Sequence, residues 1–77
     1  MDIGRLVQMA NDIGDYFASE PDRAAAVAGI ASHLERFWEA RMRRQILAHL
    51  AAGGDGLDDL PRAAIAELAM RGLGAGG

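Results

Sequence analysis

Residues 28–44 read AGIASHLERFWEARMRR, and this stretch decides how the rest of the chain is interpreted. Apolar residues at helical spacing end in the aromatic pair Phe37–Trp38, and a basic segment follows. Four of the eight basic residues of the chain lie here, around its only tryptophan: Arg36, Arg41, Arg43 and Arg44. Tryptophan and arginine are enriched at the energetically dominant positions of protein interfaces. Two interpretations fit this composition, an interface built on Trp38 and the arginines, or a core tryptophan beside a solvated basic rim.

The segments before this stretch also show helical spacing of apolar residues. A first helix is expected over residues 3–18, because one side of it is apolar: Ile3, Leu6, Met9, Ala10, Ile13, Tyr16 and Phe17. The sequence SEPD at residues 19–22 predicts a break, in which Ser19 caps a second helix and Pro21 occupies its first turn. This second helix should reach Trp38. Gly29 lies off its apolar side, where either close approach of another helix or sequence drift would explain a glycine.

The segments after the stretch predict two more helices, over residues 41–52 and 60–70. Arg43 interrupts the apolar side of the third helix, so it should either extend to water or meet a carboxylate across an interface. The sequence GGDG at residues 53–56 is typical of a helix stop, and residues 72–77 are rich in glycine. The predicted fold class is therefore all-α: a small bundle of three to four short helices, with one helical domain over residues 1–71 and a disordered tail over residues 72–77.

Length and composition exclude several classes of site. A chain of 77 residues has a core of marginal size, so tight helix packing or a protein partner is expected to stabilise it. It contains no cysteine, which excludes disulfides, thiolate zinc sites and cysteine-bound iron–sulfur clusters. The net charge of −3 counts against nucleic-acid binding. With no membrane-length apolar run and no signal-peptide pattern at the N-terminus, we expect a cytoplasmic protein.

The sequence shows no recognisable catalytic or metal-binding pattern. His33 and His49 belong to different predicted helices, and no carboxylate is placed to complete a site with them. The GGDG segment lacks the Lys-Ser/Thr ending of a P-loop. Asp55, Asp58 and Asp59 do not have the spacing of a calcium loop. We therefore expect no catalytic, cofactor-binding or metal-binding residues in this chain.

An alternative from another class is a small helical DNA-binding regulator or antitoxin-like interaction module. The helices on either side of Trp38 could form a helix–turn–helix, in which Arg41, Arg43 and Arg44 contact phosphates. Side chains that read base edges are nearly absent, since Gln45 alone is available on that helix. Together with the negative net charge, this makes DNA binding the less favoured interpretation.

Three segments resemble a known family. They are residues 6–17 (LVQMANDIGDYF), residues 26–38 (AVAGIASHLERFW) and residues 41–57, which contain RMR, LAHL and GGDGL. On these motifs, which cover roughly residues 5–60, the chain is similar to the delta subunit of cytoplasmic NAD-dependent formate dehydrogenase. This family commonly has proline between the FWE and RMR segments, where the present chain has Ala40. A weaker helix break, and a more continuous passage from Trp38 into the third helix, is therefore expected.

The resemblance implies a role in a larger complex. Complexes of this family oxidise formate to carbon dioxide at a molybdenum or tungsten centre, which carries two pterin guanine dinucleotides in a large alpha subunit. Electrons then pass through iron–sulfur clusters to FMN and NAD in other subunits. The resemblance implies that the delta subunit binds none of these cofactors and supports assembly, stability or maturation of the alpha subunit. The expected partners are the alpha, beta and gamma subunits, with no nucleic acid and no membrane.

The expected partner-binding residues come from the opening stretch and from the matching motifs. Phe37 and Trp38 are predicted to be apolar anchors for the alpha subunit. Three arginines are predicted to pair with carboxylates or carbonyls of the partner: Arg41, Arg43 and Arg44. His33 and Asn11 are added because they belong to the motifs that carry the resemblance.

Overall fold

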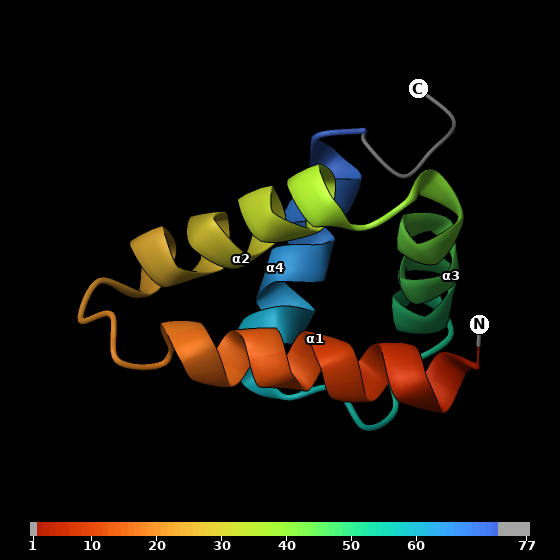
Figure 1. Cartoon of the computed structure of the whole chain (residues 1–77), viewed down its shortest axis with the longest axis horizontal. Coiled ribbons are helices and arrows are strands. Elements are labelled where there is room, and N and C mark those ends of the chain that lie inside the picture. Colours follow the sequence, from red (N-terminus) through yellow and green to blue (C-terminus); the bar gives the residue numbers. More distant parts are fainter. Residues whose placement is uncertain (1, 73–77) are drawn as a thin grey trace.

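The computed structural model describes residues 2–72, which form four helices joined by short connections (Figure 1). The helices are α1 (Ile3–Phe17), α2 (Arg23–Phe37), α3 (Ala40–Ala51) and α4 (Asp59–Met70). The prediction of a small all-α bundle is confirmed, and each helix agrees closely with its predicted range. The tail predicted over residues 72–77 lies outside the described residues, except for Gly72.

The four helices surround one apolar core. In Figure 1, α1 and α2 extend from the turn that joins them, α4 crosses behind both, and α3 lies at the opposite end. Helix α2 packs chiefly against α4, and α3 packs against α1 and α4. Each helix contributes a fully buried aliphatic side chain to the core: Leu6, Ile30, Leu34, Ile46, Ile65 and Leu68. Burial of such a side chain contributes about 1.5–3 kcal/mol to stability, so this core provides most of the driving force for folding.

Aspartates, and not Ser19, cap the first two helices. Asp2 accepts a hydrogen bond from the backbone N–H of Arg5 at 3.2 Å, and Asp22 accepts one from the N–H of Ala24 at 3.1 Å. The prediction that Ser19 caps α2 is wrong. A capping residue must stand directly before the first helical residue in an extended conformation, and Asp22 occupies that position.

The break between α2 and α3 is sharp, contrary to the continuous passage expected from Ala40. Trp38 (φ −93°, ψ 136°) and Glu39 (φ −66°, ψ 155°) are both extended, so the helical hydrogen bonding ends between them and Ala40 starts the next helix. The extended backbone allows the Trp38 side chain to enter the core, where it is 5% exposed. Burial of this large ring explains why the break persists without proline.

Two glycines permit close contacts between helices. A Cβ atom on Gly14 of α1 would lie 2.7 Å from Cδ of Pro61 in α4, which is too close for any other residue type without movement. A Cβ atom on Gly29 of α2 would lie 2.6 Å from the ring of Phe17. The Gly29 position is thus explained by an aromatic ring of α1 that packs over α2.

Candidate docking surfaces

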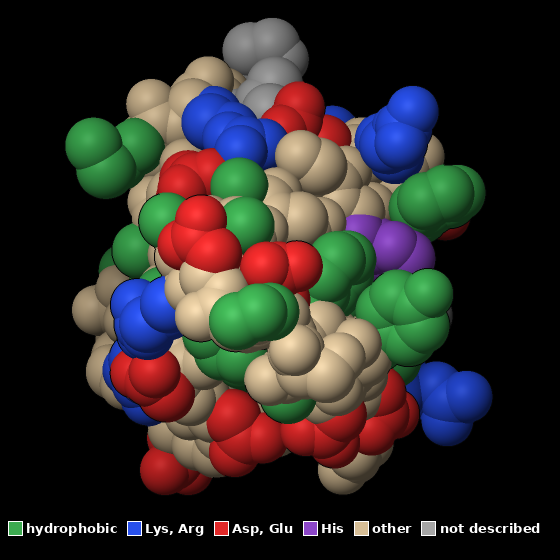
Figure 2. Space-filling model, turned by 90° about the vertical axis from the view of Figure 1, so that its left-hand side faces the viewer, with side chains coloured by type: hydrophobic (Ala, Val, Ile, Leu, Met, Phe, Trp, Pro, Cys, Tyr) green, Lys and Arg blue, Asp and Glu red, His purple; other side chains and the backbone are tan. Residues whose placement is uncertain are grey.

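The most exposed aromatic residues of the chain lie on one surface formed by α1 and α2. Tyr16 and Phe37 are 81% and 68% exposed, values unusual for large hydrophobic side chains. Two adjoining hollows connect them, and we call their apolar and aromatic lining the aromatic face: Met9, Ile13, Tyr16, Phe17, His33, Phe37, Trp38 and Met42. Figure 2, which faces the turn between α1 and α2, shows hydrophobic side chains on both sides of a histidine.

The rings of the aromatic face are arranged by contacts within the chain. Tyr16 and Phe17 meet edge to face, with centroids 5.3 Å apart and an interplanar angle of 82°. His33 lies one helical turn before Phe37, and their centroids are 4.7 Å apart with a tilt of 44°. These contacts fix the exposed rings in part, so that a partner could bind them with less loss of side-chain entropy.

A carboxylate borders the aromatic face on the α1 side. Asp12 lines both hollows and accepts a hydrogen bond from Nε2 of Gln8 at 2.9 Å. Asp15 is exposed on the same helix, and neither aspartate forms an ion pair with an arginine anywhere in residues 2–72. The face therefore suits a partner surface that combines apolar groups with basic side chains.

Trp38 belongs to the core, although it also lines one of the hollows of the aromatic face. Its side chain contacts the buried cluster and is 5% exposed, whereas the neighbouring Phe37 points outward. The structure thus supports the interpretation of Trp38 as a core residue, and Phe37 is the more exposed residue of the pair; the partner contacts expected for both stay predictions. His33 is half-buried beside Phe37 and remains accessible from the aromatic face.

Asn11 connects α1 to the segment that precedes α4. Its Nδ2 donates to the carbonyl oxygen of Gly56 at 2.9 Å, and its Oδ1 accepts from the N–H of Asp58 at 2.9 Å. Both ends of the amide are therefore used within the chain. This arrangement gives Asn11 a structural role within the chain, and the partner contact expected for it stays a prediction.

The three arginines of the predicted site have different environments. Arg43 donates to the carbonyl oxygens of Glu35, at 3.3 Å, and Trp38, which stabilises the C-terminal end of α2. Arg43 therefore contacts carbonyl groups of its own chain. The interruption of the apolar side of this helix had predicted either solvent or a carboxylate across an interface for its side chain. Arg41 and Arg44 are exposed and form no ion pair with a carboxylate in the described part of the chain.

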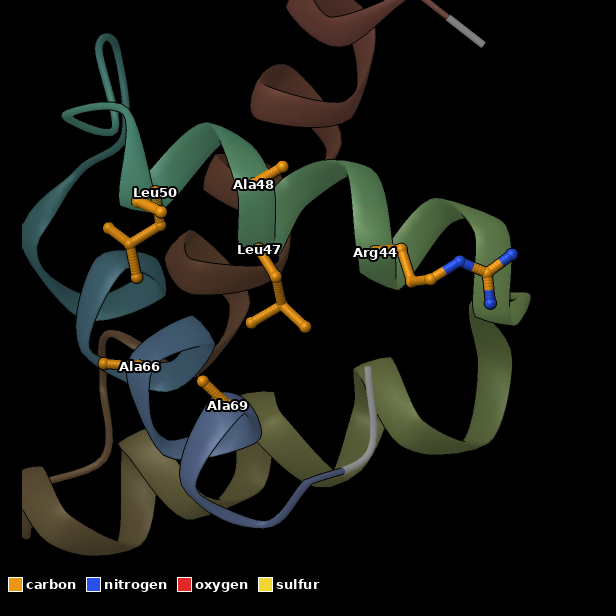
Figure 3. A pocket seen from close by; sticks show the side chains of 7 residues that line it. Arg44, Leu47, Ala48, Leu50, Ala66 and Ala69 are labelled. Atoms are coloured by element: carbon orange, nitrogen blue, oxygen red, sulfur yellow. The ribbon is translucent and has the colours of Figure 1, made fainter. Parts of the chain in front are cut away.

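A second concavity, the α3–α4 groove, lies between α3 and α4 and has none of its lining residues in common with the aromatic face. Its lining is apolar except for one arginine: Arg44, Leu47, Ala48, Leu50, Ala51, Ala66 and Ala69. Figure 3 shows Leu47 and Leu50 extending from α3 toward α4, which carries Ala66 and Ala69, while Arg44 extends beyond them. The sequence analysis identified Arg44 but not the groove, because its position depends on how α3 and α4 pack.

Tyr16 was also missed as a candidate site residue. The helical pattern placed it on the apolar side of α1 and so predicted burial, but its ring packs on Phe17 at the end of the helix and remains exposed. The sequence feature that could have identified Tyr16 as a site residue is its place in the motif over residues 6–17, which carries the family resemblance. Met70, at the end of α4, is the other highly exposed hydrophobic residue, at 89%, and it lies outside both surfaces.

Within residues 2–72, no group of three or more histidine, aspartate or glutamate side chains is placed to hold a metal ion. The sequence offers no cysteine for an iron–sulfur cluster. None of the helices in this range is both long and apolar enough to cross a membrane.

These features define a small four-helix domain with a buried tryptophan, an exposed aromatic face and a separate apolar groove. Residues 5–65 match the family model described as NADH-dependent formate dehydrogenase delta subunit FdsD. Since the match covers most of its length, the chain belongs to the family of NADH-dependent formate dehydrogenase delta subunits. Comparisons with curated proteins and with solved structures gave no match.

Proposed function

We propose that this chain is a non-catalytic accessory subunit that docks on the catalytic alpha subunit of formate dehydrogenase. In this proposal it supports the assembly, stability or maturation of the alpha subunit, in a cytoplasmic complex that also contains beta and gamma subunits. The observation that carries the proposal is the aromatic face, where Tyr16 and Phe37 are 81% and 68% exposed beside two adjoining hollows. Membership of the delta-subunit family identifies the complex from which that partner comes.

The chemistry would remain with the partners. The alpha subunit would hold the molybdenum or tungsten centre and its pterin guanine dinucleotides, and other subunits would hold the iron–sulfur clusters, FMN and NAD. The accessory subunit would act by mass action, because a ligand that binds only the folded form of a protein stabilises that form. At a concentration one hundred times its Kd, this stabilisation is about 2.7 kcal/mol.

The docking role is tested in the co-expressed complex with a paired change of Tyr16→Ser and Phe37→Ser. Truncation of aromatic residues at the centre of an interface costs about 2 kcal/mol or more, so we expect at least about thirtyfold weaker association. The measured quantities are subunit stoichiometry after gel filtration and the half-life of formate-dependent NAD reduction at raised temperature. The double variant should lose the delta subunit and shorten that half-life.

Met70→Ser provides the matched control, because it also removes an exposed hydrophobic side chain but lies outside the aromatic face. It should retain full stoichiometry and the original half-life. If the double variant copurifies in full amount and the activity decays at the original rate, the aromatic face is not the docking surface. If omission of the whole subunit changes neither yield, metal content nor half-life, the accessory role itself is wrong.

A further inference from the structure

The α3–α4 groove has a combination of shape and charge that the proposed function does not use. Four alanines form its sides, two on α3 (Ala48 and Ala51) and two on α4 (Ala66 and Ala69), each pair three residues apart. Leu47 and Leu50 lie between them and are only half-buried. The groove shares no lining residue with the hollows of the aromatic face.

The dimensions and polarity of the groove favour a helix as its occupant. Alanines three residues apart on each of two helices leave a shallow trough, in which a third helix can approach closely with its own ridge of side chains. An extended peptide would place unpaired backbone N–H and C=O groups against this apolar surface, whereas a helix satisfies its backbone hydrogen bonds internally. The lining contains one polar side chain, so a hydrogen bond or ion pair between groove side chains and an occupant can form at one position only.

That position is Arg44, whose side chain continues from the apolar groove into solvent (Figure 3). It is exposed and forms no ion pair with any carboxylate among residues 2–72. A planar guanidinium recognises a carboxylate through two parallel hydrogen bonds. The charge complementary to the groove is therefore one acidic side chain at the edge of an otherwise small and aliphatic surface.

We propose that the α3–α4 groove binds an amphipathic helix of another subunit of the complex, with small aliphatic side chains against the alanines and a carboxylate paired with Arg44. This inference rests on the proposed function, because it takes the occupant from the same complex. The groove would be a second docking site, separate from the aromatic face. The groove carries the positive charge of Arg44, whereas the aromatic face is bordered by the negative charge of Asp12. The subunit would then contact its partners through two separate surfaces, which strengthens association beyond either site alone.

The test uses the full-length chain titrated against the complex purified without its delta subunit. Ala69→Glu fills the groove with a charged side chain, and Arg44→Gln removes the positive charge. Each should weaken binding about tenfold or more, the effect expected for loss of a central interface contact. Arg44→Lys keeps the charge without the planar geometry and should retain part of the affinity. Ala25→Glu, an exposed helical alanine of α2 outside the groove, is the matched control and should bind like the original chain.

A cross-link identifies the occupant directly. With a photoreactive p-benzoylphenylalanine in place of Ala66, the cross-linked peptide in the assembled complex should come from another subunit and contain Asp or Glu in a helical pattern. A cross-link between two copies of this chain, with a dimer in sedimentation velocity that Ala69→Glu abolishes, would overturn the proposal in favour of self-association. Thermal unfolding by circular dichroism checks that each variant folds, and Arg44→Gln decides the result if Ala69→Glu does not.

The outcomes separate this inference from the proposed function. If changes to Tyr16 and Phe37 weaken binding and the groove variants do not, the accessory role stands and the groove proposal is wrong. If the original chain does not bind the complex that lacks it, the proposed function fails first. Equal affinity of Ala69→Glu, Arg44→Gln and Ala25→Glu is the result that refutes the groove as a docking site.

Discussion

Phe37 and Trp38 are adjacent in sequence but 68% and 5% exposed, so their truncation separates folding from docking. A tryptophan side chain buries roughly 200 Å². At about 25 cal/mol per Å², its loss costs up to about 5 kcal/mol, and a compact unfolded state lowers this to about 3–5 kcal/mol. Phe37 buries about a third of its surface, so Phe37→Ala should cost about 1 kcal/mol by the same reasoning. A chain of this length has a total stability of about 4–12 kcal/mol, so Trp38→Ala removes much of it.

The assay is urea unfolding of the isolated chain followed by circular dichroism, because this signal does not depend on tryptophan fluorescence. We expect a large decrease in the midpoint concentration for Trp38→Ala, an intermediate one for Trp38→Phe and a small one for Phe37→Ala, at unchanged m-value. Trp38→Phe keeps the measurement usable if the alanine variant does not fold. In the titration against the complex without its delta subunit, Phe37→Ala should bind at least about tenfold more weakly, whereas Trp38→Phe should bind normally. Equal midpoint shifts for Phe37→Ala and Trp38→Ala would refute the assignment of Trp38 to the core and Phe37 to the interface.

The remaining predictions concern contacts that position the two surfaces. Asn11→Ala removes the partner of the Gly56 carbonyl and of the Asp58 N–H, which are both exposed to water. It should destabilise the chain by about 0.5–1.5 kcal/mol and speed hydrogen exchange at the Asp58 amide. Unchanged exchange there would contradict the role of this side-chain amide. Gly14→Ala should lower the midpoint of urea unfolding, because a Cβ atom 2.7 Å from Pro61 costs about 1–3 kcal/mol and exceeds the gain of about 1 kcal/mol in helix propensity. A stabilised Gly14→Ala variant would show that α1 and α4 can separate at no cost. Arg43→Ala removes the hydrogen-bond donors to the end of α2, so it should lower the free energy of unfolding by about 1–2 kcal/mol. Arg41 is exposed, and Arg41→Ala should change this free energy by less than about 0.5 kcal/mol. Equal effects of the two substitutions would argue against capping by Arg43.

The sequence was sufficient to predict the helices because their signals are local. Apolar spacing, the SEPD and GGDG segments and the aspartates before Pro61 place every helix boundary close to its observed position. Each of these signals acts within one or two turns of the chain. The family resemblance over roughly residues 5–60 likewise agrees with the matched range 5–65.

The environments of individual site residues could not be predicted in the same way, because they depend on contacts between distant segments. Asn11 lies on the polar side of α1, but it binds a segment 45 residues away that returns to this helix only in the folded chain. Trp38 follows the end of α2, where helical periodicity no longer specifies the direction of a side chain. Tyr16 has the spacing of a buried residue, but it is 81% exposed, and the neighbouring Phe17 is the aromatic residue of α1 that packs over α2.

The predicted partner-binding residues therefore serve two purposes that the sequence alone does not distinguish. Asn11, Trp38 and Arg43 use their polar groups or their ring inside the chain, and they hold together the segments on which the surfaces lie. Phe37 and Arg44 make few such contacts and stay exposed, each on a different surface. A change at the first group is expected to weaken docking mainly because it destabilises the domain, and bound partner can compensate for it by mass action. A change at the second group weakens docking while the domain stays folded, so stability and affinity must be measured on the same variants before any residue is assigned to the interface.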